Sequence, residues 1–136
     1  MLTIKENNKN INEFNLLYDS VGWGAYDKTI SKRALDNTFY SVSVYDDDNI
    51  VGYGRLIGDT ICFIYIQDVM VKPEFQNKKI CTLIMNKLLE KINKLKKENP
   101  NIRVYLGASK NKEEFYERFG FVKRIDENLG YGMILK

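Results

Sequence analysis

The chain of 136 residues contains no histidine, two cysteines and two prolines. Without histidine, a nucleophile has no imidazole to activate it, and zinc sites built from histidine and cysteine are excluded. Cys62 and Cys81 are too few and too far apart in sequence to predict a disulfide framework, which indicates a reducing compartment. Because Cys62 lies in an apolar run, we interpret it as a small core residue. We therefore expect no metal ion.

Long apolar runs and strongly charged runs are also missing. No stretch approaches the length of a membrane span, and the first eight residues hold no apolar segment long enough for a signal peptide. We expect a cytoplasmic protein without a membrane partner. The net charge of +3 is modest and no arginine-rich run is present, so we expect no nucleic-acid partner.

The residues that are present are typical of one globular domain. Apolar residues make up 44% of the chain and aromatic residues 12%, which argues against disorder. A length of 136 residues suits a single core, and no linker or repeat divides it. We therefore expect one domain over residues 1–136.

Apolar periodicity and turn residues predict an alternating order of strands and helices. The expected strands are 2–6, 40–45, 50–57, a central strand through 61–71, a buried strand over 103–107, and two last strands from 121 and over 130–135. The expected helices are 11–20, 28–37, a long one from about 78 to 95, and 111–119.

The most informative segment joins the central strand to the long helix. Ile61–Ile66 is a continuous apolar run that predicts a buried strand, and Pro73 stops it. The loop Glu74–Lys79 then opens the helix, where unpaired N–H groups and the positive end of the helix dipole favour an anion. Lys78 and Lys79 add two cations. A diphosphate group is the ligand that such a loop receives well.

A second motif follows later in the chain. Residues 112–121 predict a short helix with Phe115 and Phe119 four positions apart, closed by Gly120 at its C-terminal cap. Together with the strand, loop and helix above, this motif resembles the GCN5-related N-acetyltransferase (GNAT) family, whose signature reads Phe/Tyr-Tyr-x-x-x-Gly-Phe at this place. The resemblance implies an α/β (α+β) fold: a mixed, mostly antiparallel sheet flanked by helices, with splayed parallel central strands.

The resemblance also implies acetyl-CoA as cosubstrate. In the family, the pantetheine arm lies between the splayed strands and bonds to the backbone, as an added strand would. Carried over to this chain, the main chain of Val69, Met70 and Val71 would hold the pantetheine. Lys110 would reach the adenosine phosphate, with plain solvation as the alternative. The diphosphate would lie on residues 76–82, namely Gln76, Asn77, Lys78, Lys79, Ile80, Cys81 and Thr82.

The loop departs from the family pattern at two positions. Gln76 matches, but Lys79 stands at the first glycine and Cys81 at the second. Glycine permits unusual φ angles and close approach of the backbone to a ligand. Either the loop takes a conformation that a side chain accepts, with the ammonium replacing a lost contact, or coenzyme binding is weakened; we favour the first.

The implied reaction is direct attack by a primary amine on the acetyl thioester, with a backbone N–H near Val69 stabilising the oxyanion. Tyr116 is placed by resemblance as the general acid. Without histidine, the base is a carboxylate, a water chain or a backbone group, and Asp68 is our candidate, with a structural role tied to backbone amides as the alternative. In a regular strand Gln67 and Asp68 point to opposite faces.

The acceptor is the least determined part. If the family layout holds, Trp23, Tyr26, Tyr53 and Arg55 border the acceptor pocket, and aromatic walls favour a small-molecule amine. Two other functions stay open: a noncatalytic acyl-CoA-binding or regulatory module, and an acetyltransferase acting on protein lysines or N-termini. We expect a monomer or a homodimer.

Overall fold

The computed structural model describes residues 1–125 and 128–136. The chain forms two compact units, Met1–Leu106 and Gly107–Lys136, and each is described by itself.

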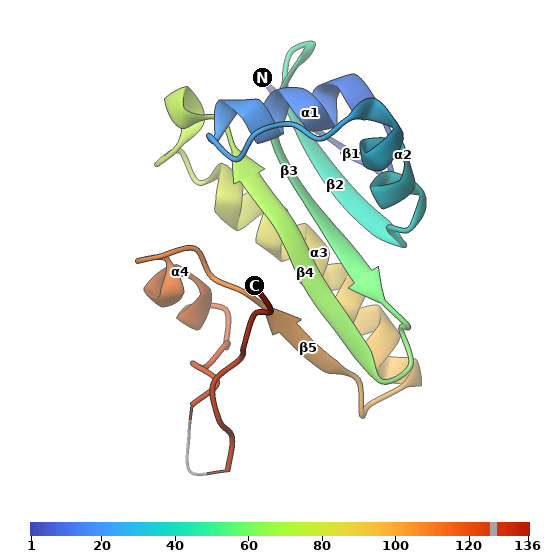
Figure 1. Ribbon diagram of the computed structural model, residues 1–136, viewed down its shortest axis with the longest axis vertical. Helices are drawn as coiled ribbons and strands as arrows, with labels where there is room; N and C mark the ends of the chain where they lie inside the picture. Colours follow the sequence, from blue (N-terminus) through green and yellow to red (C-terminus); the bar gives the residue numbers. More distant parts are fainter. Residues whose placement is uncertain (126–127) are drawn as a thin grey trace. The chain divides into compact units, whose positions relative to one another are not determined.

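The first unit is a sheet with helices on its two faces (Figure 1). Within the described residues the strands follow the order β1-β2-β3-β4-β5, antiparallel except for the parallel pair β4–β5. The strands are β1 (Leu2–Glu6), β2 (Tyr40–Asp46), β3 (Asn49–Gly58), β4 (Phe63–Val71) and β5 (Arg103–Leu106). The helices are α1 (Ile11–Ser20), α2 (Lys28–Asp36), the 3-10 turn η1 (Pro73–Phe75) and α3 (Ile80–Glu98). These bounds confirm the mostly antiparallel mixed fold predicted from the sequence.

Two apolar layers cover the sheet. On one face α1 and α2 bury a cluster that includes Phe14, Leu17, Tyr53 and Met70. On the other face α3 lies against β3 (Figure 1). A Cβ added at Gly54 would come within 2.8 Å of Cγ2 of Ile84 and 3.1 Å of Cδ1 of Leu88, so the absence of a side chain there lets α3 approach the sheet. Positions that alternate along β3 therefore face two different helical layers.

A β-bulge interrupts the pairing of β3 with β4. Tyr53 pairs with Met70 and Arg55 pairs with Gln67, so β4 carries one more residue than β3 over this stretch. The extra residue is accommodated at Asp68, which has φ of +54°. Aspartate tolerates this left-handed conformation better than most residues. The sequence pattern shows no bulge, since Gln67 and Asp68 stand where a regular strand alternates.

The parallel partner of β4 is short. Pairing with β5 runs from Phe63 opposite Arg103 to Ile66 opposite Leu106, whereas β4 continues to Val71. No strand pairs with 67–71 on that side among the described residues, and β5 lies beside the first part of β4 in Figure 1. Pairing between the two central strands therefore ends at Ile66 and Leu106. Two details were wrong: β5 alternates between exposed and half-buried residues instead of being buried, and Cys62 is exposed.

Cys62 is exposed because it lies in the turn before β4 and not in the strand. One carboxylate oxygen of Asp59, Oδ1, accepts hydrogen bonds from the backbone N–H groups of Ile61, Cys62 and Phe63, at 2.7–3.0 Å. These bonds lower the pKa of Asp59 below its ordinary value of 3.8. They hold Cys62 in a turn on the surface.

The second unit holds α4 (Glu113–Glu117), which continues in turns to Gly120. Gly120 has φ of +95°, as expected of the predicted C-terminal cap. The predicted strands from Phe121 and over 130–135 do not form in the described residues, and residues 126–127 lie outside them. Tyr131 is 71% exposed and Leu135 is 98% exposed. A strand needs a partner for its backbone groups and its apolar face, and the described part of this unit supplies none.

The conformation of Lys79 is strained. It is the N-cap of α3 and has φ of +63°, in the left-handed region that favours glycine. Asn77 has the same φ, but asparagine is a residue type that tolerates it. The loop therefore keeps the backbone conformation typical of a glycine, which corrects our expectation that it adopts one suited to a side chain.

Replacing Lys79 by glycine is expected to stabilise the protein. Lys79→Gly removes a left-handed cost of about 1–2 kcal/mol and adds a smaller entropic cost of roughly 0.5–1 kcal/mol in the unfolded chain. The matched control Lys78→Gly, at a residue without positive φ, is expected to destabilise. Urea unfolding of both variants tests this expectation, and a loss of stability in Lys79→Gly would contradict it.

Candidate active site

The open edge of β4 leads directly into the start of α3. Val69, Met70 and Val71 lie beyond the last residue that pairs with β5. The side chain of Met70 is buried in the core, so the main chain is what this residue offers to a ligand. After η1, the side-chain amide of Gln76 donates to the carbonyl oxygen of Val71 at 3.1 Å, which ties the loop back to the end of the strand.

The N-terminus of α3 is not capped by its own side chains. Lys79 makes no side-chain capping bond and the first turn contains no acidic residue. The positive end of the helix dipole is therefore not compensated within the described part of the helix. Asn77, Lys78 and Lys79 are exposed, and the ammonium of Lys78 lies 5.2 Å from the ring centroid of Phe75. This arrangement suits an anionic ligand.

The three residues that follow differ in exposure. Ile80 is buried in the core, whereas Cys81 and Thr82 are half-buried. The predicted diphosphate segment is thus continuous from Gln76 to Thr82, and Ile80 can contribute to it through its main chain alone.

Asp68 is a buried carboxylate that accepts hydrogen bonds from three side chains. Its carboxylate is 2% exposed and accepts a hydrogen bond from Nε of Arg55 at 2.7 Å, another from the Tyr18 hydroxyl, and a third from the Gln67 amide at 3.2 Å. Burial and the neighbouring carboxylate raise the pKa of Tyr18 well above its ordinary value. These contacts correct the expectation that Gln67 and Asp68 point to opposite faces, because the bulge at Asp68 interrupts the alternation.

Arg55 extends this cluster to α2. Its Nη1 donates to the carbonyl oxygen of Ala34 at 3.3 Å and to Oγ1 of Thr38 at 3.1 Å. The three bonds to Asp68 occupy most of the roughly four lone-pair sites of a carboxylate, so little acceptor capacity is left for a proton. These contacts support the structural alternative for Asp68. The groups that hold its carboxylate are side chains, however, and not the backbone amides that we expected.

The aromatic residues predicted to border the acceptor separate into two groups. Trp23 and Tyr26 are about half exposed, and their ring centroids lie 5.5 and 5.2 Å from that of Tyr18. Tyr53 is 2% exposed and packs edge-on against Phe14. Its position in the core does not support direct contact with an acceptor.

The second unit carries Tyr116 and Lys110. Tyr116 lies on α4, with its ring centroid 5.1 Å from Phe115 and 6.4 Å from Phe121. Phe119 also packs on Phe115, as the four-residue spacing predicts. Lys110 is exposed in the segment before α4. The predicted sequence motif therefore forms a small aromatic cluster around one short helix.

Within the described residues no helix is long and apolar enough to cross a membrane. The same residues contain no group of three or more acidic, cysteine or histidine side chains placed to hold a metal ion.

Three residues near the site were not singled out from the sequence. Tyr18 is separated from Asp68 by 50 positions, and its place on the apolar face of α1 is its one sequence signal. Thr38 and Arg33 lie near the end of α2, where polar residues are common, so nothing in the sequence sets them apart. Their contacts depend on how α1 and α2 pack on the sheet.

Known proteins resemble this chain in sequence and in structure. Residues 17–133 match the family model described as acetyltransferase (GNAT) domain. The uncharacterized N-acetyltransferase ycf52 of the red alga Gracilaria tenuistipitata is 30% identical over 121 residues. That match covers 86% of this chain and 64% of the relative, so the chain spans somewhat less than two thirds of its length.

Two bacterial structures share the fold over nearly their whole length. A protein of unknown function from Staphylococcus aureus, named as a probable acetyltransferase, is 25% identical with a TM-score of 0.86, covering 100% of this chain and 99% of that one. A GNAT family protein from Streptococcus pneumoniae is 26% identical with a TM-score of 0.80, covering 100% and 98%. The residues matched by the family model make up most of the chain and include the open edge of β4 and the loop before α3. This chain therefore belongs to the GNAT acetyltransferase family.

Proposed function

We propose that this protein is an N-acetyltransferase that moves the acetyl group of acetyl-CoA to a primary amine of a small molecule, by direct attack in a ternary complex. The observation that carries the proposal is that β4 runs on to Val71 after its pairing with β5 ends at Ile66, and leads into the uncapped start of α3. An open backbone edge followed by a helix N-terminus suits an amide-bearing arm that ends in phosphates. We further propose that residues 1–136 work as one domain, as a monomer or a homodimer.

The residues fit the coenzyme as follows. Val69, Met70 and Val71 would bond to the pantetheine amides, residues 76–82 would hold the diphosphate, and Lys110 would meet the adenosine phosphate. The coenzyme supplies an activated acyl group. The backbone N–H near Val69 would stabilise negative charge on the acyl oxygen. Tyr116 would donate a proton to the departing sulfur, a role that rests on the family resemblance.

Asp68 stays the proposed base. It is the buried carboxylate beside the open edge of β4, and the chain contains no histidine. Its bonds to Arg55 and Tyr18 would hold it in place between proton transfers. Trp23 and Tyr26 offer half-exposed aromatic faces on which an ammonium group can bind.

One observation favours the noncatalytic alternative. Lys79 occupies a left-handed position, so an exposed side chain stands where the family has a glycine against the ligand. If this side chain obstructs the diphosphate, the domain binds acyl-CoA weakly and turns over nothing.

The first experiment is a calorimetric titration with acetyl-CoA, with ATP as the control ligand. We expect binding in the micromolar range by wild type, and acetylation of at least one amine of a broad panel. Lys79→Gly, measured beside Lys78→Gly, reports whether Lys79 hinders the coenzyme. Binding without acetylation of any amine would favour the noncatalytic module, and absence of binding would overturn the proposal.

Replacing Tyr116 by phenylalanine removes the proposed acid and leaves the ring in place. We expect kcat to fall by about a hundredfold or more, with the affinity for acetyl-CoA unchanged. Tyr131→Phe is the matched control, since Tyr131 is an exposed tyrosine of the same unit. Unchanged turnover in Tyr116→Phe would remove this residue from the mechanism.

Replacing Asp68 by asparagine separates the two roles of this residue. If Asp68 is the base, kcat falls by about a hundredfold or more and the low-pH limb of the kcat profile disappears. Asp48→Asn, in an exposed turn, is the control. A raised KM with an unchanged pH profile would show that Asp68 only positions its neighbours. Circular dichroism checks folding, because the substitution leaves Arg55 buried without its carboxylate.

A further inference from the structure

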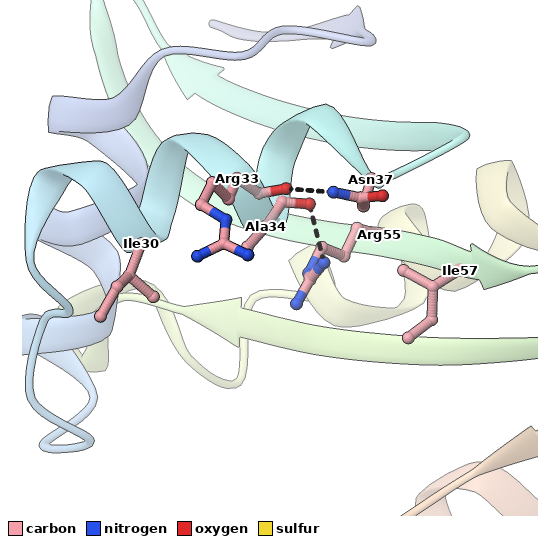
Figure 2. A pocket seen from close by; sticks show the side chains of 6 residues that line it. All are labelled: Ile30, Arg33, Ala34, Asn37, Arg55 and Ile57. Atoms are coloured by element: carbon pink, nitrogen blue, oxygen red, sulfur yellow. Dashed lines mark hydrogen bonds between the residues drawn. The ribbon is translucent and has the colours of Figure 1, made fainter.

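An open pocket of about 360 Å³ lies between α2 and the sheet. Its lining residues are Ile30, Arg33, Ala34, Asn37, Arg55 and Ile57. Figure 2 shows Ile30 and Ile57 at opposite ends, with the guanidinium groups of Arg33 and Arg55 between them. The pocket is of the size that holds a small molecule.

The charge of this pocket has one sign. Its walls carry Arg33 and Arg55, and no acidic residue lines it in the described part of the chain. Asp68 lies behind Arg55 with 2% of its side chain exposed, so it neutralises that guanidinium from the buried side. On α2, Asp36 is paired with Lys32 at 2.7 Å, away from the lining. Arg33 therefore adds a cation that forms no ion pair with a carboxylate of the described residues.

Arg55 also keeps hydrogen-bonding capacity for a ligand. Nε is used by Asp68, and Nη1 is used by Ala34 and Thr38. Its second terminal nitrogen, Nη2, makes no hydrogen bond to the described residues. A guanidinium is a fixed planar fork, and a carboxylate or phosphate matches it well. Because its other bonds hold the side chain in place, Arg55 can bind an anion with little further loss of conformational freedom.

The pocket is separate from the region proposed for the coenzyme phosphates. Arg55 and α2 lie on the sheet face covered by α1, whereas α3 packs on the opposite face, against Gly52 and Gly54. An anion in this pocket would therefore be distinct from the diphosphate that we assign to residues 76–82.

From this arrangement we infer that the acceptor is an amine that carries an oxyanion, a carboxylate or a phosphate, which binds Arg33 and Arg55 in the pocket under α2. This inference rests on the proposed function and names its substrate class. The aliphatic side chains of Ile30 and Ile57 would contact the carbon skeleton of the acceptor. The primary amine stays the group that is acetylated.

The test compares pairs of amines that differ in the anion. Acetylation rates are measured for butylamine against 4-aminobutanoate, and for ethanolamine against O-phosphoethanolamine. We expect kcat/KM of wild type to favour the anionic member of at least one pair by about tenfold or more. The pair that shows the preference distinguishes a carboxylate from a phosphate.

Two variants assign the preference to the pocket. Arg33→Gln is expected to reduce it severalfold by raising KM, because the charge is lost while kcat is untouched. Lys28→Gln removes a charge from an exposed residue of α2 outside the lining and leaves the Lys32–Asp36 pair intact, so it is expected to retain the preference. Arg55→Lys keeps a cation for Asp68 and removes the free Nη2, so it is expected to reduce the preference as well.

A binding measurement separates this inference from the proposed function. Wild type, Arg33→Gln and Lys28→Gln are titrated with 4-aminobutanoate and with O-phosphoethanolamine in the presence of free coenzyme A. Binding that is lost in Arg33→Gln alone supports the inference even if no acetyl transfer occurs. Equal use of charged and neutral amines by wild type, or a preference that survives in both arginine variants, would overturn it while the acetyltransferase proposal stands.

Discussion

The ion pair between Arg55 and Asp68 joins four elements of the first unit. Asp68 lies at the bulge of β4 and accepts from Tyr18 of α1, while Arg55 on β3 donates to Ala34 in α2 and to Thr38 just after it. Both charges are largely withdrawn from water, so removing one partner would leave the other uncompensated, at a cost of about 3–5 kcal/mol. The pair therefore links both helices to the sheet, beside the apolar cluster that packs them there.

The bulge and the short β5 strand give β4 two distinct features, one in the direction of a side chain and one in its open backbone edge. On the face covered by α1, the bulge directs Asp68 toward Arg55 and Tyr18. At the strand edge, the end of pairing with β5 at Ile66 leaves the main chain of the following residues open. One strand thus has side chains on the side that we propose for the acceptor and open backbone groups at the edge that we propose for the coenzyme. The tie from Gln76 to the Val71 carbonyl joins this edge to the start of α3.

Elements with strong local signals were predicted well. The bounds of β1 and α1 agree with the prediction, and α2 and α3 differ at their ends by one to three residues, because apolar periodicity and turn residues are local properties. The last two strands were predicted from apolar residues such as Tyr131 and Leu135, but a strand also needs a partner, and that requirement is not local. The exposure of Cys62 was missed for a different reason: its apolar neighbours suggested a strand, whereas three local backbone hydrogen bonds to Asp59 form a turn there.

The sequence by itself determined the family motifs, the order of most elements, and the segment from Val69 to Thr82 that we assign to the coenzyme, because these are contiguous residues with a local pattern. The tertiary structure decided which polar side chains meet. Tyr18 and Asp68 are 50 positions apart, and Arg33 reaches the pocket beside Arg55 after α2 packs on the sheet. A hydrogen bond or ion pair acts over a few ångströms. Partners that are distant in the chain meet because the burial of apolar faces packs their helices and strands together, and the local sequence around each residue does not reveal that packing.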